Sequence, residues 1–284
     1  MTTTDASLWV HYQLPTNVPA SVPEAALAAA QDPHEDPRFT GLAKAQPTGM
    51  LVLRAPYETA DDNGRRAYHT SPIVLVVGEH QLVTLSTRPL PAAQALEQAA
   101  STAESPLDLA FTLCWQVFQQ YTADTAAIDE VTRAMAKRVR DAAHNELLYE
   151  IMALEQSLVW FTAALTHSKA LVAALQDRFP EHATLHRAAV ECGQALTVAE
   201  STEEILDQYN TAISSVVANN LNLIMKMLTS VSILLAIPPI FSGIWGQNTW
   251  LPWAKPTYGF WIVLALSLGT ALVVGWWLHR KDYF

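Results

Sequence analysis

Residues 227–245 read MLTSVSILLAIPPIFSGIW, and residues 258–278 read YGFWIVLALSLGTALVVGWWL. Neither run contains a charged side chain, and each has about the 20 residues that a helix needs to cross a hydrocarbon core of roughly 30 Å. The two runs are separated by only 12 residues, which is unusual for two fully apolar helices in a soluble core. We therefore predict two membrane-spanning helices near the carboxyl end.

The placement of tryptophan supports the two spans. Six of the nine tryptophans lie in the last 40 residues, near the ends of both runs, and indole rings prefer that headgroup depth. The sequence His279-Arg280-Lys281 follows the second run, and basic flanks favour the cytoplasmic side. We predict a multi-pass protein of the cell membrane, with both termini in the cytoplasm. Its membrane part comprises a first span at 221–245, an external loop at 246–257, a second span at 258–278 and a basic tail at 279–284.

The two parts of the chain carry net charges of opposite sign. No Asp or Glu occurs between Asp207 and Asp282, so the last 77 residues carry a net charge of +3, whereas the first 207 carry −13 from 13 basic and 26 acidic residues. An acidic body repels nucleic acid, which needs clustered Lys and Arg to replace the counterions of its phosphates. The charge pattern therefore excludes nucleic acid as a partner and fits an acidic domain joined to a lipid bilayer anchor.

Catalysis has no candidate residues in the sequence. There is no nucleophile–base pattern and no glycine loop of the kind that cradles phosphate, so we expect no enzymatic activity and no cofactor. Cys114 and Cys192 lack metal-type spacing and are expected to be buried free thiols. The amino-terminal sequence MTTTDASLWV lacks the basic start and apolar run of a signal peptide, so the acidic domain is expected in the cytoplasm.

The first 90 residues are predicted to form an α/β head. Runs rich in Val, Leu and Ile, bounded by turn-forming residues, predict strands over residues 8–14, 49–54, 73–77 and 81–86. The last two should form a hairpin with the three-residue turn Gly78-Glu79-His80. An Ala-rich helix opened by Pro23 is expected to run to Ala30, before the loop QDPHEDP.

From Pro91 onward the spacing of apolar residues becomes helical. This pattern predicts a helical region over 91–220, in which one helix ends at Phe179-Pro180 and a long stalk helix begins near residue 181 and runs to Pro238. The predicted fold class is an α+β cytoplasmic head with a long helical stalk or funnel, followed by two transmembrane α-helices.

The end of the first span carries the most specific motif. It reads Gly243-Ile244-Trp245-Gly246-Gln247-Asn248, with Leu251-Pro252 shortly after, and it is preceded by NNLNLIMKMLT over 219–229. Here the sequence resembles the CorA family of magnesium and related divalent-cation transporters, whose first transmembrane helix ends in an aromatic residue followed by Gly-Met-Asn. The detailed resemblance covers roughly residues 205–284. It implies passive, gradient-driven transport through the central pore of a homo-oligomer, expected to be a pentamer, without nucleotide hydrolysis.

Two departures from the family pattern bear on the transported ion. Gln247 replaces the signature Met, and Lys255 stands in the external loop, which lacks the usual acidic residues. Relatives that move zinc tolerate other residues at the middle position. The resemblance therefore implies hydrated Mg²⁺ as the favoured cargo, with Co²⁺ and Ni²⁺ as further candidates. It leaves open a zinc transporter of the same family, and a non-conducting, membrane-anchored sensor or assembly protein with the same fold.

Gly246, Gln247 and Asn248 are the predicted selectivity filter. Because Mg²⁺ dehydrates reluctantly, a ring of Asn248 side chains would contact the metal through its hydration shell. Gly246 is expected to turn the backbone with a positive φ. A Gln247 side chain facing the axis would add a second ring of oxygens, whereas one facing a neighbouring subunit, which we favour, would mainly fix the turn. The alternative is that these residues form only a helix-terminating turn.

Five residues of the first span fall on one stripe about 80° wide, at about 100° per residue. They are Asn222, Met225, Thr229, Ile233 and Ala236. The stripe carries an amide, a thioether, a hydroxyl and then apolar groups that could gate by dewetting, and it is the predicted pore lining. Alternatively, the polar members hydrogen-bond to other membrane helices. Lys226 lies beside the stripe and is predicted to snorkel to the cytoplasmic interface.

Acidic residues precede the membrane at helical spacing, namely Glu200, Glu203, Glu204 and Asp207. This acidic stripe could concentrate cations or form regulatory metal sites between subunits, and a solvated helix face explains it equally well. Glu181, His182 and His186 also have the spacing of metal ligands on a helix, although an exposed helix face accounts for them too.

Overall fold

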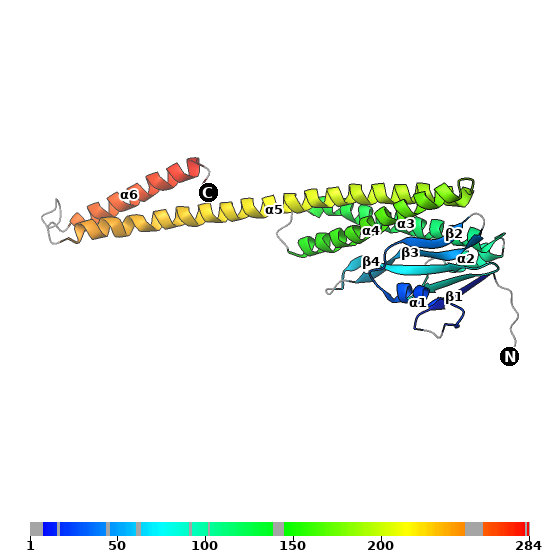
Figure 1. Ribbon diagram of the computed structural model, residues 1–284. Helices are drawn as coiled ribbons and strands as arrows, with labels where there is room; N and C mark the ends of the chain where they lie inside the picture. Colours follow the sequence, from blue (N-terminus) through cyan, green and yellow to red (C-terminus); the bar gives the residue numbers. More distant parts are fainter. Residues whose placement is uncertain are drawn as a thin grey trace. The chain divides into compact units, whose positions relative to one another are not determined.

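The computed structural model describes residues 8–15, 18–43, 46–60, 64–90, 93–101, 103–138, 145–247, 258–281 and 283. The chain divides into two compact units, Met1–Thr211 and Ala212–Phe284. Figure 1 shows the elements coloured along the sequence, with the strands in blue and cyan.

The amino-terminal unit contains a five-stranded sheet. Its strands are β1 (Trp9–Gln13), β2 (Arg38–Ala43), β3 (Gln46–Ala60), β4 (Arg66–Val77) and β5 (Leu82–Ser86). The spatial order is β1-β5-β4-β3-β2. Strand β1 pairs in parallel with β5, and the other neighbours are antiparallel. Helix α1 (Glu24–Gln31) lies between β1 and β2 in the sequence, with Pro23 at its N-cap position.

All four strands expected from the sequence are present, but the sheet contains more than the pattern indicated. Strand β2 was missed because it is an edge strand with five of its six side chains exposed or half-buried, and because its pairing is interrupted at Gly41 (φ 73°) and Leu42 (φ 50°). Strand β4 begins at Arg66 rather than Ile73. The predicted three-residue turn is wrong, since four residues separate the paired Val77 and Leu82.

The two faces of the sheet are covered by different helices (Figure 1). On one face, α1 packs Ala26, Ala29 and Ala30 against Val52 and Val74. On the other face lie α3 (Pro106–Arg138) and α4 (Asn145–Arg178), where the ring of Tyr68 on β4 contacts that of Phe161 on α4 at 5.7 Å between centroids. Strand β4 is buried along most of its length, and because successive side chains point to opposite faces of the sheet, its near-continuous apolar run contributes to both cores.

The remaining helices are α2 (Ala93–Ala100), α5 (Ala183–Trp245) and α6 (Gly259–Arg280). Helices α3 and α4 are antiparallel, since Phe111 near the start of α3 contacts Phe179 just after α4, whereas Tyr121 contacts Phe161 in the middle of α4. Helix α5 returns along both of them, and Thr122 of α3 donates a 2.7 Å hydrogen bond to Glu191. The fold class expected from the sequence, an α/β head with long helices and an apolar carboxyl-terminal helix, is therefore confirmed.

Helix α5 runs past Pro238, to which the helical pattern was traced, and continues through Pro239 to Trp245. Its end thus coincides with the predicted end of the first span at residue 245. Each proline lacks an N–H donor, so the carbonyl groups four residues earlier lose their usual helical partners. The helix nevertheless continues because, in an apolar segment, helix is the conformation that satisfies most of the remaining backbone groups.

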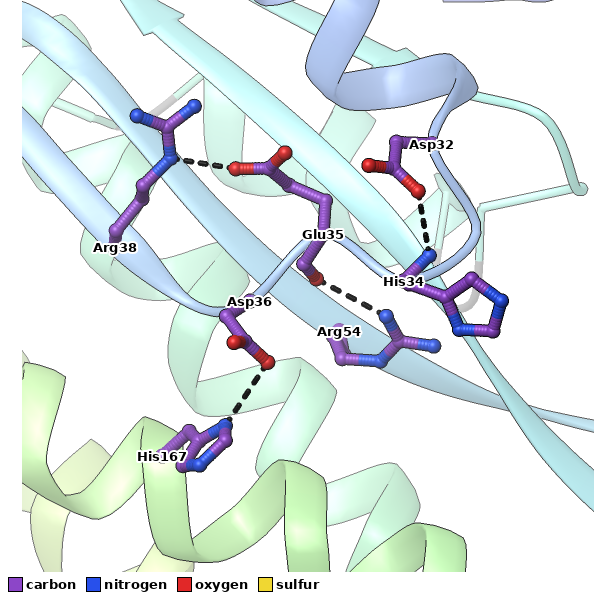
Figure 2. Close-up of polar contacts among 7 residues, drawn as sticks. All are labelled: Asp32, His34, Glu35, Asp36, Arg38, Arg54 and His167. Atoms are coloured by element: carbon purple, nitrogen blue, oxygen red, sulfur yellow. Dashed lines mark hydrogen bonds and ion pairs between the residues drawn. The ribbon is translucent and has the colours of Figure 1, made fainter.

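A buried arginine anchors the loop between α1 and β2 to the sheet (Figure 2). Arg54 on β3 is only 7% exposed, and its guanidinium donates to the hydroxyl and carbonyl oxygens of Thr70 and to the backbone oxygen of Glu35 at 2.9–3.0 Å. The neighbouring Asp36 contacts His167 of α4 at 3.0 Å. These bonds connect three elements and fix the loop QDPHEDP, whose absence of regular structure was expected from its prolines.

The Asp124 carboxyl on α3 gives the amino-terminal unit a pH-dependent stability. Burial raises its pKa from 3.8 to about 6; a hydrogen bond from Gln120 and the charge of Arg66 oppose the increase, whereas Glu58 adds to it. The folded state therefore disfavours the ionised form. The resulting loss of folding stability is absent below pH 3.8, develops as the pH rises towards 6 and is complete above that value.

Replacing Asp124 with Asn should therefore stabilise the folded protein only where Asp124 would be ionised. After allowance for solvent screening of this partly exposed group, we expect a gain of about 1–2 kcal/mol at pH 8, or about 2–6 °C in Tm. Thermal unfolding of the purified full-length variant and wild type at about pH 8 and about pH 4 measures the difference. An equal gain at both pH values would contradict the assignment.

Candidate functional site

The carboxyl-terminal unit is built from the last part of α5 and from α6. On α5, Ser230 and Ile237 are buried, and a side-chain carbon added at Gly275 of α6 would lie 3.6 Å from Leu234. The buried residues of α6 recur at helical spacing and include Gly259, Ser267 and Leu278. Small residues in such a stripe are usual where helices pack in a membrane.

The predicted pore-lining stripe lies on a different face of α5. Asn222, Met225, Thr229, Ile233 and Ala236 are all exposed, with Met225 at 59% and Ile233 at 41%. At about 100° per residue, the centre of this stripe is about 110° away from the face that packs on α6. Within the described part of the chain, neither Asn222 nor Thr229 is hydrogen-bonded to α6. The stripe is thus left free on the surface of the two-helix unit.

Two of the three predicted filter residues, Gly246 and Gln247, lie just after α5 among the described residues. The Gly246 N–H donates to the Ser242 oxygen at 2.8 Å, and the Gln247 N–H lies 3.5 Å from the Ile244 oxygen. The expected positive φ at Gly246 is wrong. Glycine fits here because an added side-chain carbon would lie 3.0 Å from the Ser242 oxygen. Gln247 is exposed, and Asn248 lies outside the described residues.

The acidic stripe on α5 is divided between solvent and α4. Glu200, Glu204 and Asp207 are exposed, whereas Glu203 is half-buried and accepts a 3.4 Å hydrogen bond from Thr162 of α4. The sequence analysis missed a further acidic residue close to this stripe, Glu155 on α4. Burial, followed by the charge of Asp207, raises the pKa of Glu155, whereas a hydrogen bond with Asn210 opposes the shift. Glu155 could not be placed beside Asp207 without knowing how α4 and α5 pack.

The predicted metal-ligand spacing at the start of α5 does not produce a metal site. His182 Nε2 lies 2.6 Å from Asp108 of α3, and His186 Nδ1 is 3.3 Å from the amide of Gln176. Glu181 is exposed. Among the described residues, no group of three or more His, Cys, Asp or Glu side chains could hold a metal ion. These histidines therefore connect helices within the amino-terminal unit.

Three helices of the described residues are long and apolar enough to cross a membrane by length and composition. One is Glu146–Arg178, essentially α4, but 44% of its most apolar window is buried inside the structure, compared with 11% for α5 and for α6. A much larger share of this apolar window in α4 thus packs against protein, although Met152 and Val159 remain exposed. The apolar side chains of α5 and α6, including Leu235 at 70% and Leu272 at 74% exposure, require an apolar surrounding.

The whole chain was compared with known protein families. The sequence model of the CorA-like Mg²⁺ transporter protein family matches residues 5–280. The chain belongs to this family. The family predicted from the sequence is thereby confirmed, and the match extends over the head as well.

Individual proteins that resemble this chain are distant in sequence but similar in fold. The cobalt/magnesium transport protein CorA of Methanocaldococcus jannaschii is 20% identical over 248 residues, which cover 82% of this chain and 76% of that protein. The complete structure of the CorA magnesium transporter from the same organism matches with a TM-score of 0.76 at 19% identity, covering 93% of this chain and 84% of that one. The structure of full-length CmaX matches with a TM-score of 0.68 at 17% identity, covering 97% and 88%.

Proposed function

We propose that this CorA-family protein conducts hydrated divalent cations passively, down their electrochemical gradient, through the central pore of a homo-oligomer. Mg²⁺ is the favoured cargo, with Co²⁺ and Ni²⁺ as further substrates. The observation that carries the proposal is the exposed stripe from Asn222 to Ala236, which stands clear of the α5–α6 contact. A two-helix unit cannot enclose an aqueous path by itself, whereas several copies can line one with this stripe.

In this proposal α5 and α6 span the cell membrane and both termini lie in the cytoplasm. Support comes from the apolar exposed surfaces of the two helices and from the basic residues that follow α6. The acidic stripe near Glu200 and Asp207 would raise the local concentration of cations before they enter the pore. The amide of Asn248 would contact the hydrated ion at the other end.

Flux into liposomes tests the proposed function. Purified protein reconstituted with an internal metal-sensitive dye should admit Mg²⁺, Co²⁺ and Ni²⁺ when the membrane potential is inside-negative, in the absence of any nucleotide. Zn²⁺ is included because Gln247 departs from the Gly-Met-Asn signature, and Zn²⁺ as the preferred ion would establish the alternative cargo. Flux no greater than that of protein-free liposomes, for all four metals, would favour a non-conducting sensor or assembly protein.

The oligomeric state is predicted to be a pentamer, as the family resemblance implies. Native mass spectrometry of the detergent-purified chain should give about five times the chain mass of 31.2 kDa. A monomer or dimer as the largest species, in detergents that preserve flux on reconstitution, would contradict a pore shared between subunits.

Replacing Gln247 with Met restores the family signature and should change the transport rate more than the ranking of metals. Gln offers a carbonyl and an amide, whereas Met is soft and a poor acceptor. We expect the exposed Gln247 side chain to contact a neighbouring subunit and fix the turn. Fluxes of Mg²⁺, Co²⁺, Ni²⁺ and Zn²⁺ are compared for both forms. A reversed ranking would place Gln247 in the filter itself.

A further inference from the structure

The carboxyl-terminal unit carries unbalanced positive charge. Its described residues include Lys226, Arg280 and Lys281 but no Asp or Glu. The sole acid that the sequence holds after Asp207 is Asp282, which lies outside the described residues. The three cations therefore have no carboxylate partner in the described part of this unit.

A ring contact brings the cations of the two helices to one end of the unit. The Lys226 ammonium on α5 lies 5.7 Å from the centroid of the Tyr283 ring. The Tyr283 N–H donates to the Leu278 oxygen at 3.2 Å, which holds Tyr283 against the last turn of α6. Lys226 immediately precedes the first uncharged run, and Arg280 closely follows the second. All three cations thus lie at the same boundary of the apolar region.

Aromatic rings contact two of these cations. The Arg280 guanidinium carbon lies 5.5 Å from the centroid of the Trp276 ring, and Trp276 and Trp277 are 60% and 53% exposed. Cation–π contacts of this kind orient the side chains but leave most of their N–H donors available to an acceptor. Exposed indole rings beside basic groups are typical of the headgroup layer of a bilayer.

We propose that Lys226, Arg280 and Lys281 bind the phosphates of anionic phospholipids at this boundary, with Trp276 and Tyr283 beside the headgroups. Anionic phosphates at headgroup depth supply the negative charge that the described part of this unit lacks. Each Lys or Arg near an anionic surface favours binding by a factor of about five. A zwitterionic lipid carries its own cationic group next to the phosphate, so the three basic side chains should add little to its binding. The inference requires α5 and α6 to span a bilayer, and it is independent of which metal is transported.

Native mass spectrometry of the full-length protein tests the lipid preference. The detergent-purified oligomer is titrated with phosphatidylglycerol, with phosphatidylcholine of the same acyl chains, and separately with inorganic phosphate. The wild type should retain phosphatidylglycerol preferentially. Replacing Arg280 alone with Gln should lower its affinity about fivefold, and the triple replacement Lys226→Gln, Arg280→Gln and Lys281→Gln should lower it by more than about 50-fold. Affinity for phosphatidylcholine should change little.

The matched control is Lys255→Gln, which removes a Lys from the sequence between the two uncharged runs and should leave the preference unchanged. The charge-conserving pair Lys226→Arg and Lys281→Arg should retain it as well, and the same spectra report whether each variant still assembles. An unchanged preference in the triple variant, or an equal loss in Lys255→Gln, would overturn the proposal. Displacement of the lipid by low concentrations of inorganic phosphate would also overturn it, because the ligand would then be the free ion.

Discussion

Replacing Asn248 with Ala is expected to abolish selective divalent-cation flux while leaving the oligomer intact. Asn248 follows the exposed Gln247, which lies two residues beyond the end of α5, and its amide is the neutral oxygen ligand that the filter motif offers to the water shell of the ion. The substitution removes this group from every subunit at once. If each amide contributes about 1 kcal/mol, the loss of five should reduce flux by at least about 100-fold.

Asn220→Ala provides the matched control for this variant. Asn220 is also exposed on α5, but it lies about 160° around the helix from Asn222 and away from the proposed pore lining. This control should conduct like the wild type. Native mass spectra of both variants establish that assembly is unaffected. Wild-type Mg²⁺ flux in Asn248→Ala liposomes would remove Asn248 from the filter.

A bulky positive charge attached at position 229 is expected to block flux, whereas the same treatment at position 230 should not. Thr229 is exposed on the proposed pore lining, and the adjacent Ser230 is fully buried. A cationic methanethiosulfonate reagent should therefore modify Thr229→Cys and reduce flux by at least about tenfold, because the added group narrows the path and repels cations. Ser230→Cys should react slowly and keep its flux.

The native cysteines permit this experiment without being removed. Cys114 and Cys192 are both buried, and burial raises the pKa of each thiol to about 12. Since the thiolate is the reactive species, the background reaction should be small, and wild-type flux should be insensitive to the reagent. Block of Ser230→Cys with no effect on Thr229→Cys would place a different face of α5 toward the ions.

The two apolar helices and the long stalk could be predicted because their signals are local. An uncharged run of membrane length and a 3.6-residue period are properties of contiguous sequence, and the stripe from Asn222 to Ala236 follows from the same period. Strand β2 carries no such signal, because its exposed edge position and the interruption at Gly41 remove the alternation on which strand prediction depends.

Contacts between distant segments could not be read from the sequence. The proximity of Glu155 to Asp207 depends on how α4 and α5 pack, and the contact of Lys226 with Tyr283 depends on the return of α6 along α5. The backbone at Gly246 was predicted from the preference of glycine for positive φ, but its small size matters here because the Ser242 oxygen is close. Residue type indicated that glycine was needed without indicating the reason.

Current recorded across a planar bilayer tests the central claim most directly. Purified protein in a membrane that separates two concentrations of MgCl₂, without nucleotide, should carry a current whose reversal potential approaches the equilibrium potential of Mg²⁺. That result would establish passive conduction selective for the cation. A reversal potential at the chloride equilibrium value, or no current from protein shown to be assembled in the same membrane, would contradict it.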